Sequence, residues 1–83
     1  MIIIMGLIVI MGDKMIRKSV VSSNLSSVGY DSKTRKLEIE FHGGRIYEYY
    51  NVPENIYLSL LSASSHGKFF HRNIKNRFDF NRI

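Results

Sequence analysis

The chain contains no cysteine, which excludes a disulfide framework and a thiolate metal site. Its fold must therefore rest on a hydrophobic core alone, and a reducing cytoplasm is the expected setting. The histidines His42, His66 and His71 are scattered along the sequence, whereas a metal site needs ligands that converge. We therefore expect neither a metal nor another cofactor.

The sequence also lacks a catalytic constellation. Its serines have no nucleophile motif around them, and Gly43-Gly44 has neither the spacing nor the following Lys-Ser/Thr of a phosphate-binding loop. With 83 residues the chain forms one small domain, in which a pocket of useful size is hard to build. We therefore expect a protein that is not an enzyme and that has no small-molecule substrate.

No hydrophobic run is long enough to span a bilayer as a helix, which takes about 17–25 residues. The longest apolar run, residues 1–11, carries no charge, and the basic residues Lys14, Arg17 and Lys18 follow it instead of preceding it as in a secretory signal. We therefore divide the chain into an apolar N-terminal extension, residues 1–14, and a single domain, residues 15–83.

Three interpretations of this extension stay open. In the first, Met15 is the true start, since Met15-Ile16-Arg17-Lys18 begins the first segment that is typical of a domain. In the second, the apolar run forms an extra strand or contacts a hydrophobic partner. In the third, residues 1–11 contact a membrane as an atypical targeting segment.

Alternation of apolar and charged side chains predicts a half-buried strand over residues 36–41. The sequence His42-Gly43-Gly44 then reverses the chain into a return strand, residues 45–50. Upstream, a short extended segment leads to a bend at Ser22-Ser23-Asn24, and a strand follows over residues 27–30. The centre of the chain is therefore expected to form an antiparallel sheet.

The length of the loop between the two central strands decides which way the tyrosines point. A three-residue loop pairs Ile39 with Tyr47 and Leu37 with Tyr49, whereas a two-residue loop turns both tyrosines to the acidic face of the sheet. We predict the three-residue loop, with Gly44 in the left-handed conformation, because it produces one continuous apolar face for helices to cover.

Helices follow the sheet. Pro53 at a first helical position predicts a helix that ends at about Ser62. Ser65 is the expected N-cap of a second helix, residues 66 to about 76, and the tail, residues 78–83, alternates like a final short strand. The sum is an α+β fold, a small antiparallel sheet of about three to four strands with two helices packed on one face.

Several short motifs occur together and in order. They are Ser22-Ser23-Asn24-Leu25, Val28-Gly29-Tyr30-Asp31, Leu37-x-Ile39-x-Phe41, Gly44, Tyr47-x-Tyr49, Val52-Pro53, Tyr57, Leu60, Ala63-x-Ser65-x-Gly67 and Phe69-Phe70. The ordered set resembles the KTSC domain, which is named for the C-terminal extension of some lysyl-tRNA synthetases and also occurs as a small stand-alone bacterial protein. The resemblance runs from about residue 20 to residue 83.

This resemblance implies a compact domain with a central Y-x-Y, whose function is not established and for which RNA binding is the usual suggestion. The position after the second phenylalanine is commonly Asn in the family, and here it is His71. We expect structural roles for the family-motif residues Tyr30, Asp31, Tyr47, Tyr49, Val52, Pro53, Ser65, Gly67 and Phe70.

Basic residues gather near the C-terminus. Lys68, Arg72 and Lys75 stand at i, i+4 and i+7 of the predicted second helix, and Arg77 and Arg82 extend the charge. The whole chain has a formal net charge of +5 and a pI of about 9.8. These five residues form a candidate phosphate-binding stripe. The alternative is that they are only the water-facing side of an amphipathic helix.

Tyr47 and Tyr49 are predicted to be core residues instead of a stacking platform for unpaired bases. If they faced water on the other side of the sheet, they would lie beside Glu38 and Glu40, whose carboxylates would repel phosphates. We therefore expect any contact with RNA on the second helix and the tail.

The leading hypothesis is a small non-enzymatic binding module that binds RNA, such as tRNA, through its basic C-terminal helix. The rival hypothesis is a module for protein interaction or self-association that does not bind nucleic acid. The apolar extension and the sheet edge that a small domain exposes favour this rival.

The open question about the start of the chain has a direct test. If Met15 is the true start, mass spectrometry of the protein from its native source is expected to yield an N-terminal peptide that begins there. A peptide that contains Ile2 to Val9 would contradict this interpretation and leave the other two.

Overall fold

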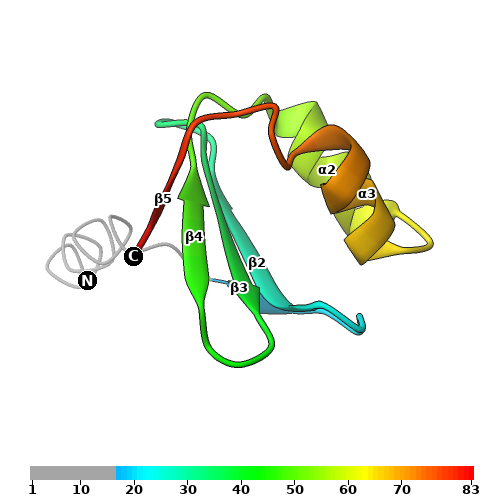
Figure 1. Cartoon of the computed structure of the whole chain (residues 1–83). Coiled ribbons are helices and arrows are strands. Elements are labelled where there is room, and N and C mark those ends of the chain that lie inside the picture. Colours follow the sequence, from blue (N-terminus) through cyan, green and yellow to red (C-terminus); the bar gives the residue numbers. More distant parts are fainter. Residues whose placement is uncertain (1–16) are drawn as a thin grey trace, which may run out of the picture.

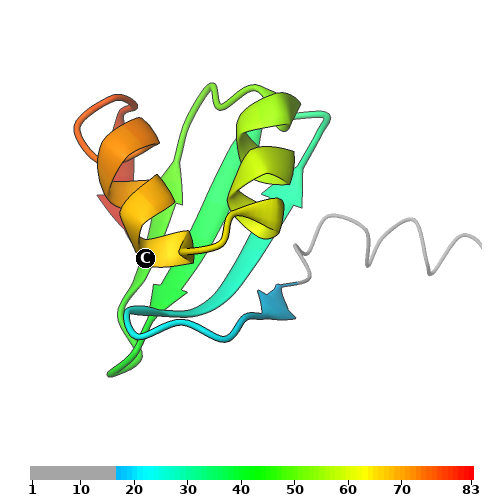
Figure 2. The ribbon, with the colours of Figure 1, turned by 90° about the vertical axis from the view of Figure 1, so that its right-hand side faces the viewer.

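The computed structural model describes residues 17–83, so the predictions about the extension, residues 1–14, lie outside the described part. Strands pair antiparallel in sequence order, and two helices lie on one face of the sheet (Figures 1 and 2). The elements are β1 (Lys18–Ser19), β2 (Leu25–Asp31), β3 (Lys36–Phe41), β4 (Ile46–Tyr49), α2 (Glu54–Ser62), α3 (His66–Asn73) and β5 (Phe80–Arg82). This arrangement confirms the predicted α+β class.

The sheet has five strands in place of the predicted three to four. The additional strand is β1, which pairs with β2 through Lys18 opposite Val28 and Ser19 opposite Ser27. A strand of two residues is too short for alternation to reveal. β2 also begins earlier than predicted, at Leu25. The sequence pattern misses this start because a bulge between Leu25 and Ser27 interrupts the alternation there.

The register of β3 and β4 is the one that the three-residue loop predicts. Leu37 lies opposite Tyr49, and Ile39 lies opposite Tyr47. Gly44 has a φ of +91°, which L side chains rarely adopt, so the loop depends on glycine at this position. The apolar face of the hairpin therefore points toward the helices, and its charged face points away from them.

The two helices divide the covered face between them, with α2 over the β2 side and α3 over the β4 side (Figure 2). Tyr30 of β2 stacks on Tyr57 of α2 at a centroid distance of 5.0 Å, and Phe70 of α3 packs edge-on against Tyr49 of β4 at 5.7 Å. The buried core draws on both layers and consists of Leu25, Val28, Leu37, Ile39, Tyr49, Val52, Leu60, Phe70 and Ile74.

Both helices begin close to the predicted positions. Pro53 is the N-cap of α2 and not its first residue, and α2 ends where predicted. Ser65 caps α3 as predicted, because its side chain accepts the backbone N–H of Lys68 at 3.3 Å. The predicted end of α3 near residue 76 is wrong. The helix ends at Asn73. Ile74 has a φ of −121°, and the Lys75 N–H donates to the carbonyl oxygen of Phe70 at 2.9 Å instead of to that of His71.

Truncation of the two β4 tyrosines tests this packing. Tyr49 is 4% exposed, so Tyr49→Ala is expected to lower the free energy of unfolding by about 3–5 kcal/mol. Tyr47 is half-buried, and Tyr47→Ala is expected to cost less, about 1–2 kcal/mol. Urea denaturation followed by circular dichroism measures both values. Equal losses would contradict the division into one core tyrosine and one half-buried tyrosine.

Candidate nucleic-acid interface

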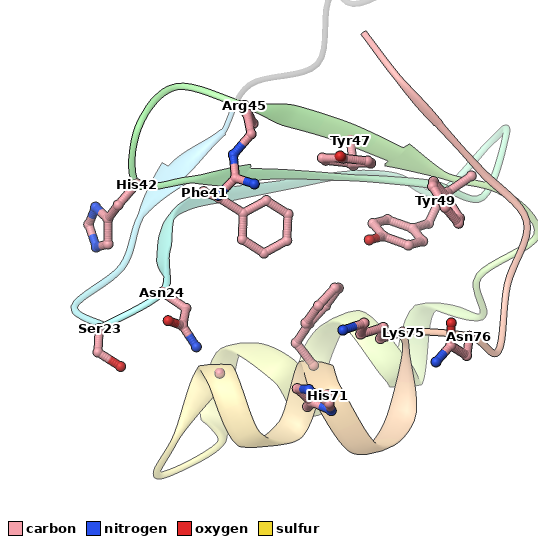
Figure 3. A pocket seen from close by; sticks show the side chains of 13 residues that line it. Ser23, Asn24, Phe41, His42, Arg45, Tyr47, Tyr49, His71, Lys75 and Asn76 are labelled. Atoms are coloured by element: carbon pink, nitrogen blue, oxygen red, sulfur yellow. The ribbon is translucent and has the colours of Figure 1, made fainter.

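A groove runs between α3 and the β3–β4 half of the sheet (Figure 3). Its volume is about 450 Å³, which lies in the range of small-molecule sites. A hollow of this size is more than we expect from so small a domain, in which a pocket is hard to build. Aromatic side chains of α3, β3 and β4 stand between the helix and the sheet and line the groove.

Five aromatic side chains line the groove and contact one another in a closed circuit, which we call the aromatic cluster. Successive ring centroids are 5.3–5.8 Å apart, in edge-on and tilted geometries that aromatic pairs favour. In order around the circuit the members are Phe41, Tyr47, Phe80, Tyr49 and Phe70. Tyr49 and Phe70 are buried, whereas Phe80 is 50% exposed. The cluster thus belongs to the core on one side and presents aromatic surface to the groove on the other.

Strand alternation and register assemble this cluster. Arg45, Tyr47 and Tyr49 stand at alternate positions and share the face that α3 covers. β5 pairs with β4 so that Arg82 lies opposite Tyr47 and Phe80 opposite Tyr49. Because directly paired residues share a face, β5 adds the Phe80 ring to the cluster and places Arg82 on the same side of the sheet.

Polar and basic side chains form the rim of the groove. Arg45 reaches in from the sheet, and Lys75 reaches in from the chain that follows α3 (Figure 3). The other polar side chains of the rim are Ser23, Asn24, His42, His71 and Asn76. Among the described residues that line the groove there is no Asp or Glu. The charge of the groove is therefore complementary to an anion.

The carboxylates of the sheet lie on its opposite face. Glu38 forms an ion pair with Arg17, and Glu40 accepts a hydrogen bond from the Ser27 hydroxyl at 2.8 Å. Glu48 is paired with Glu38 in the register and shares this face. These carboxylates therefore point away from the groove, and the greater separation lowers their repulsion of an anion bound there.

Tyrosine ionisation does not change this balance at neutral pH. Burial, and to a smaller extent the nearby Tyr47, raise the pKa of Tyr49 to about 12. The Tyr49 phenol is therefore neutral at pH 7. It can serve the groove as an aromatic surface without contributing negative charge.

The five predicted cationic residues do not form a single stripe. Lys68 and Arg72 line a second, smaller hollow beside α3, with a volume of about 280 Å³. Lys75 lies beyond the end of α3 and lines the groove. Arg77 Nε donates to the carbonyl oxygen of Arg72 at 3.2 Å, and Arg82 is exposed on β5. Lys68 and Arg72 thus lie on one side of α3 and Lys75 on another, whereas Arg82 belongs to β5.

Most of the family-motif residues make contacts within the fold. The Tyr30 hydroxyl donates to the carbonyl oxygen of Val52, and the Asp31 carboxylate accepts a backbone N–H of the turn that follows it. A Cβ at Gly67 would lie 3.1 Å from Asn24 Nδ2, so the close approach of α3 to the bend before β2 favours glycine. These contacts support structural roles for the three motif residues.

Several groove residues are absent from the sequence-based site. They include Arg45 and Phe80, and the prediction of a core position for Tyr47 is too simple, because that ring is half-buried and faces the groove. The signal for Arg45 is present in the pattern Arg45-x-Tyr47-x-Tyr49, since alternate strand residues share a face. Phe80 gives no such signal, because only the pairing of β5 with β4 brings it to the tyrosines.

Residues 17–83 contain no group of three side chains placed to hold a metal ion. No helix in that same range has the length and apolarity needed to cross a bilayer. The candidate site therefore consists of the groove, the aromatic cluster and the cations around α3.

Comparison with known proteins places this geometry in a family. The model of the KTSC domain matches residues 21–78. A lysine–tRNA ligase of Nostoc punctiforme is 38% identical over 61 residues, which cover 74% of this chain and 11% of the ligase. An uncharacterized protein of Stutzerimonas stutzeri is 41% identical over 59 residues, which cover 71% of this chain and 83% of that protein. The crystal structure of a KTSC domain protein from Yersinia pestis has a TM-score of 0.79 at 43% identity and covers 83% of this chain and 97% of that one.

The raised pKa of Tyr49 predicts how stability depends on pH. Because the folded pKa, about 12, exceeds the unfolded value near 10, the neutral phenol stabilises the fold fully below pH 10, and this contribution is lost as the pH rises toward 12. Wild type is therefore expected to lose more stability than Tyr49→Phe between pH 10 and 12. Urea unfolding at several pH values measures the difference, and parallel curves would show that the Tyr49 hydroxyl is solvated in the fold.

Proposed function

Because the chain belongs to the KTSC domain family, we propose that it is a small non-enzymatic module that binds RNA through the cations around α3. In this proposal the RNA phosphates contact Lys68, Arg72, Lys75, Arg77 and Arg82. The partner is a structured or single-stranded RNA of the tRNA class. The absence of cysteine from the sequence is consistent with action in the cytoplasm.

The separation of charge across the domain is the observation that carries the proposal. The segment 63–78 contains no Asp or Glu, and it includes all of α3. The carboxylates Glu38, Glu40 and Glu48 lie on the sheet face that the helices do not cover. A polyanion is therefore attracted more strongly to the α3 side than to the opposite side, where Arg17 and Lys36 offset only part of the acidic charge. This difference orients its approach.

Phosphate contacts of this kind provide affinity without sequence readout. The side chains of Lys68 and Arg72 are exposed next to the same hollow, so an RNA backbone can reach both without rearrangement of the fold. The relatives that are lysine–tRNA ligases support tRNA as the class of partner. This chain corresponds to about a tenth of their length, so the activity of the whole ligase is not transferred to it.

Reversal of two charges beside α3 tests the proposal. The full-length Lys68→Glu/Arg72→Glu variant is expected to bind a tRNA transcript and a short unstructured RNA at least about tenfold more weakly than wild type. Removal of two phosphate contacts should also flatten the plot of log Kd against log salt by about 1.4 for the single strand, at about 0.7 per contact. Fluorescence anisotropy between about 50 and 200 mM salt measures both quantities.

A matched control separates a local site from general charge. Lys18→Glu/Lys33→Glu makes the same change in net charge at exposed positions that line neither the groove nor the hollow. This control should keep most of the affinity. If both double variants bind as wild type does, or lose affinity equally, the cations around α3 are only a solvated surface. Light scattering that shows concentration-dependent mass would then favour the rival protein-interaction function.

A further inference from the structure

The groove beside α3 has two properties that phosphate contacts alone do not need. The first is its aromatic wall. Of the five rings in the aromatic cluster, Phe80 is 50% exposed, and Phe41 and Tyr47 are half-buried. An open hollow of about 450 Å³ next to these rings leaves part of their surface without a packing partner. A flat aromatic ligand can cover that surface, because bases stack on the faces of Phe and Tyr.

The second property is the pair of cations at the rim. Arg45 comes from the strand side and Lys75 from the helix side, and Figure 3 shows both beside the same hollow. Both side chains are exposed, and no Asp or Glu lies among the described residues around the groove. An aromatic ligand that also carries a negative charge therefore fits the site better than a neutral one.

Hydrogen-bonding groups complete the rim. The side chains of Asn24, His71 and Asn76 can donate to or accept from the polar edge of a base. A phosphate alone would not contact the aromatic wall, and an apolar ligand would not interact with the charges of Arg45 and Lys75. A base and a phosphate in one ligand use the wall, the polar edge and the cations together.

We propose that the groove holds one unpaired nucleotide of the bound RNA, with its base stacked on the aromatic cluster and its phosphate facing Arg45 and Lys75. This inference rests on the proposed function, and it adds a base-binding site to the phosphate contacts. A nucleotide in a duplex cannot enter, because its base is stacked on both faces and paired along one edge. The groove therefore selects single-stranded or looped segments over duplex RNA.

Lys75 connects the two sites. It belongs to the predicted set of phosphate-contacting residues, and it also lines the groove. Lys75 follows Arg72 by three residues in the chain, so in this proposal an RNA strand that passes from the hollow beside Arg72 to the groove contacts the two cations in turn. Its next base then turns toward the aromatic wall. The cations hold the strand, and the groove takes one base from it.

The test uses the full-length chain and two variants of the groove. Phe80→Ala removes the most exposed ring of the cluster, and Arg45→Glu reverses an exposed rim charge without touching the cluster. Leu58→Ala, which shortens an apolar side chain that is 54% exposed on α2, is the control for the first. Lys33→Glu, in an exposed turn, is the control for the second. NMR spectra of the backbone amides check that each variant is folded.

Phe80→Ala is expected to raise the Kd for a short unstructured RNA by about five- to 150-fold, the range for loss of one base–aromatic stack, and to leave the Kd for duplex RNA within about twofold. Arg45→Glu is expected to weaken binding of the unstructured RNA as well, and both controls should bind like wild type. In the same NMR spectra, nucleoside 5′-monophosphates should shift the amide signals of residues that line the groove, and the shifts should saturate. Ribose 5-phosphate, which has no base, should not shift them.

The outcomes separate this inference from the proposed function. If Phe80→Ala and Arg45→Glu bind unstructured RNA as wild type does, while Lys68→Glu/Arg72→Glu is still weakened, the nucleotide site is overturned and RNA binding stands. If wild type binds duplex and unstructured RNA with equal affinity, and Phe80→Ala lowers both affinities equally, the groove does not select an unpaired base and the inference falls. If wild type binds neither RNA, the proposed function and this inference fall together.

Discussion

The pairing of β3 with β4 decides which side chains of β4 meet the helices. The left-handed conformation at Gly44 permits the loop that sets Ile39 opposite Tyr47 and Leu37 opposite Tyr49. A slip of one residue would exchange the two faces of β4 and turn both tyrosines away from α3. The aromatic cluster and the groove depend on this register, and so does the placement of Arg45 at the groove.

Alternation along β3 separates charge, and the register with β4 adds Glu48 to the acidic face. With the apolar positions of β3 under the helices, Glu38 and Glu40 necessarily occupy the other face, because strand side chains alternate. The segment 63–78, which includes α3 and contains no Asp or Glu, then covers the face from which these carboxylates are absent. In a domain with so small a core, one pairing choice thus produces both the packing and the polarity of the surface. Stability and the proposed binding of RNA are therefore coupled through the sheet.

Local patterns predict the parts of this fold that depend on neighbouring residues. Alternation over residues 36–41 identifies β3, and Ser65 identifies the start of α3, because each signal lies within a few residues of its effect. The errors occur where distant contacts decide. α3 ends early, at Asn73, and β1 exists as a strand only because β2 lies beside it. Phe80 joins the site through pairing with a strand that lies about 30 residues earlier in the chain, where no local pattern indicates it.

By itself, the sequence determined the α+β class, the register of the central hairpin and the surplus of positive charge near the C-terminus. These follow from residue spacing, from glycine in the loop and from composition, all of which are local or additive properties. Only the tertiary structure decided that the cations do not form one stripe, and that a groove opens beside Tyr47. The physical reason is that a cavity is the space left between elements, and its shape depends on how bulky rings from β3, β4, α3 and β5 pack against one another.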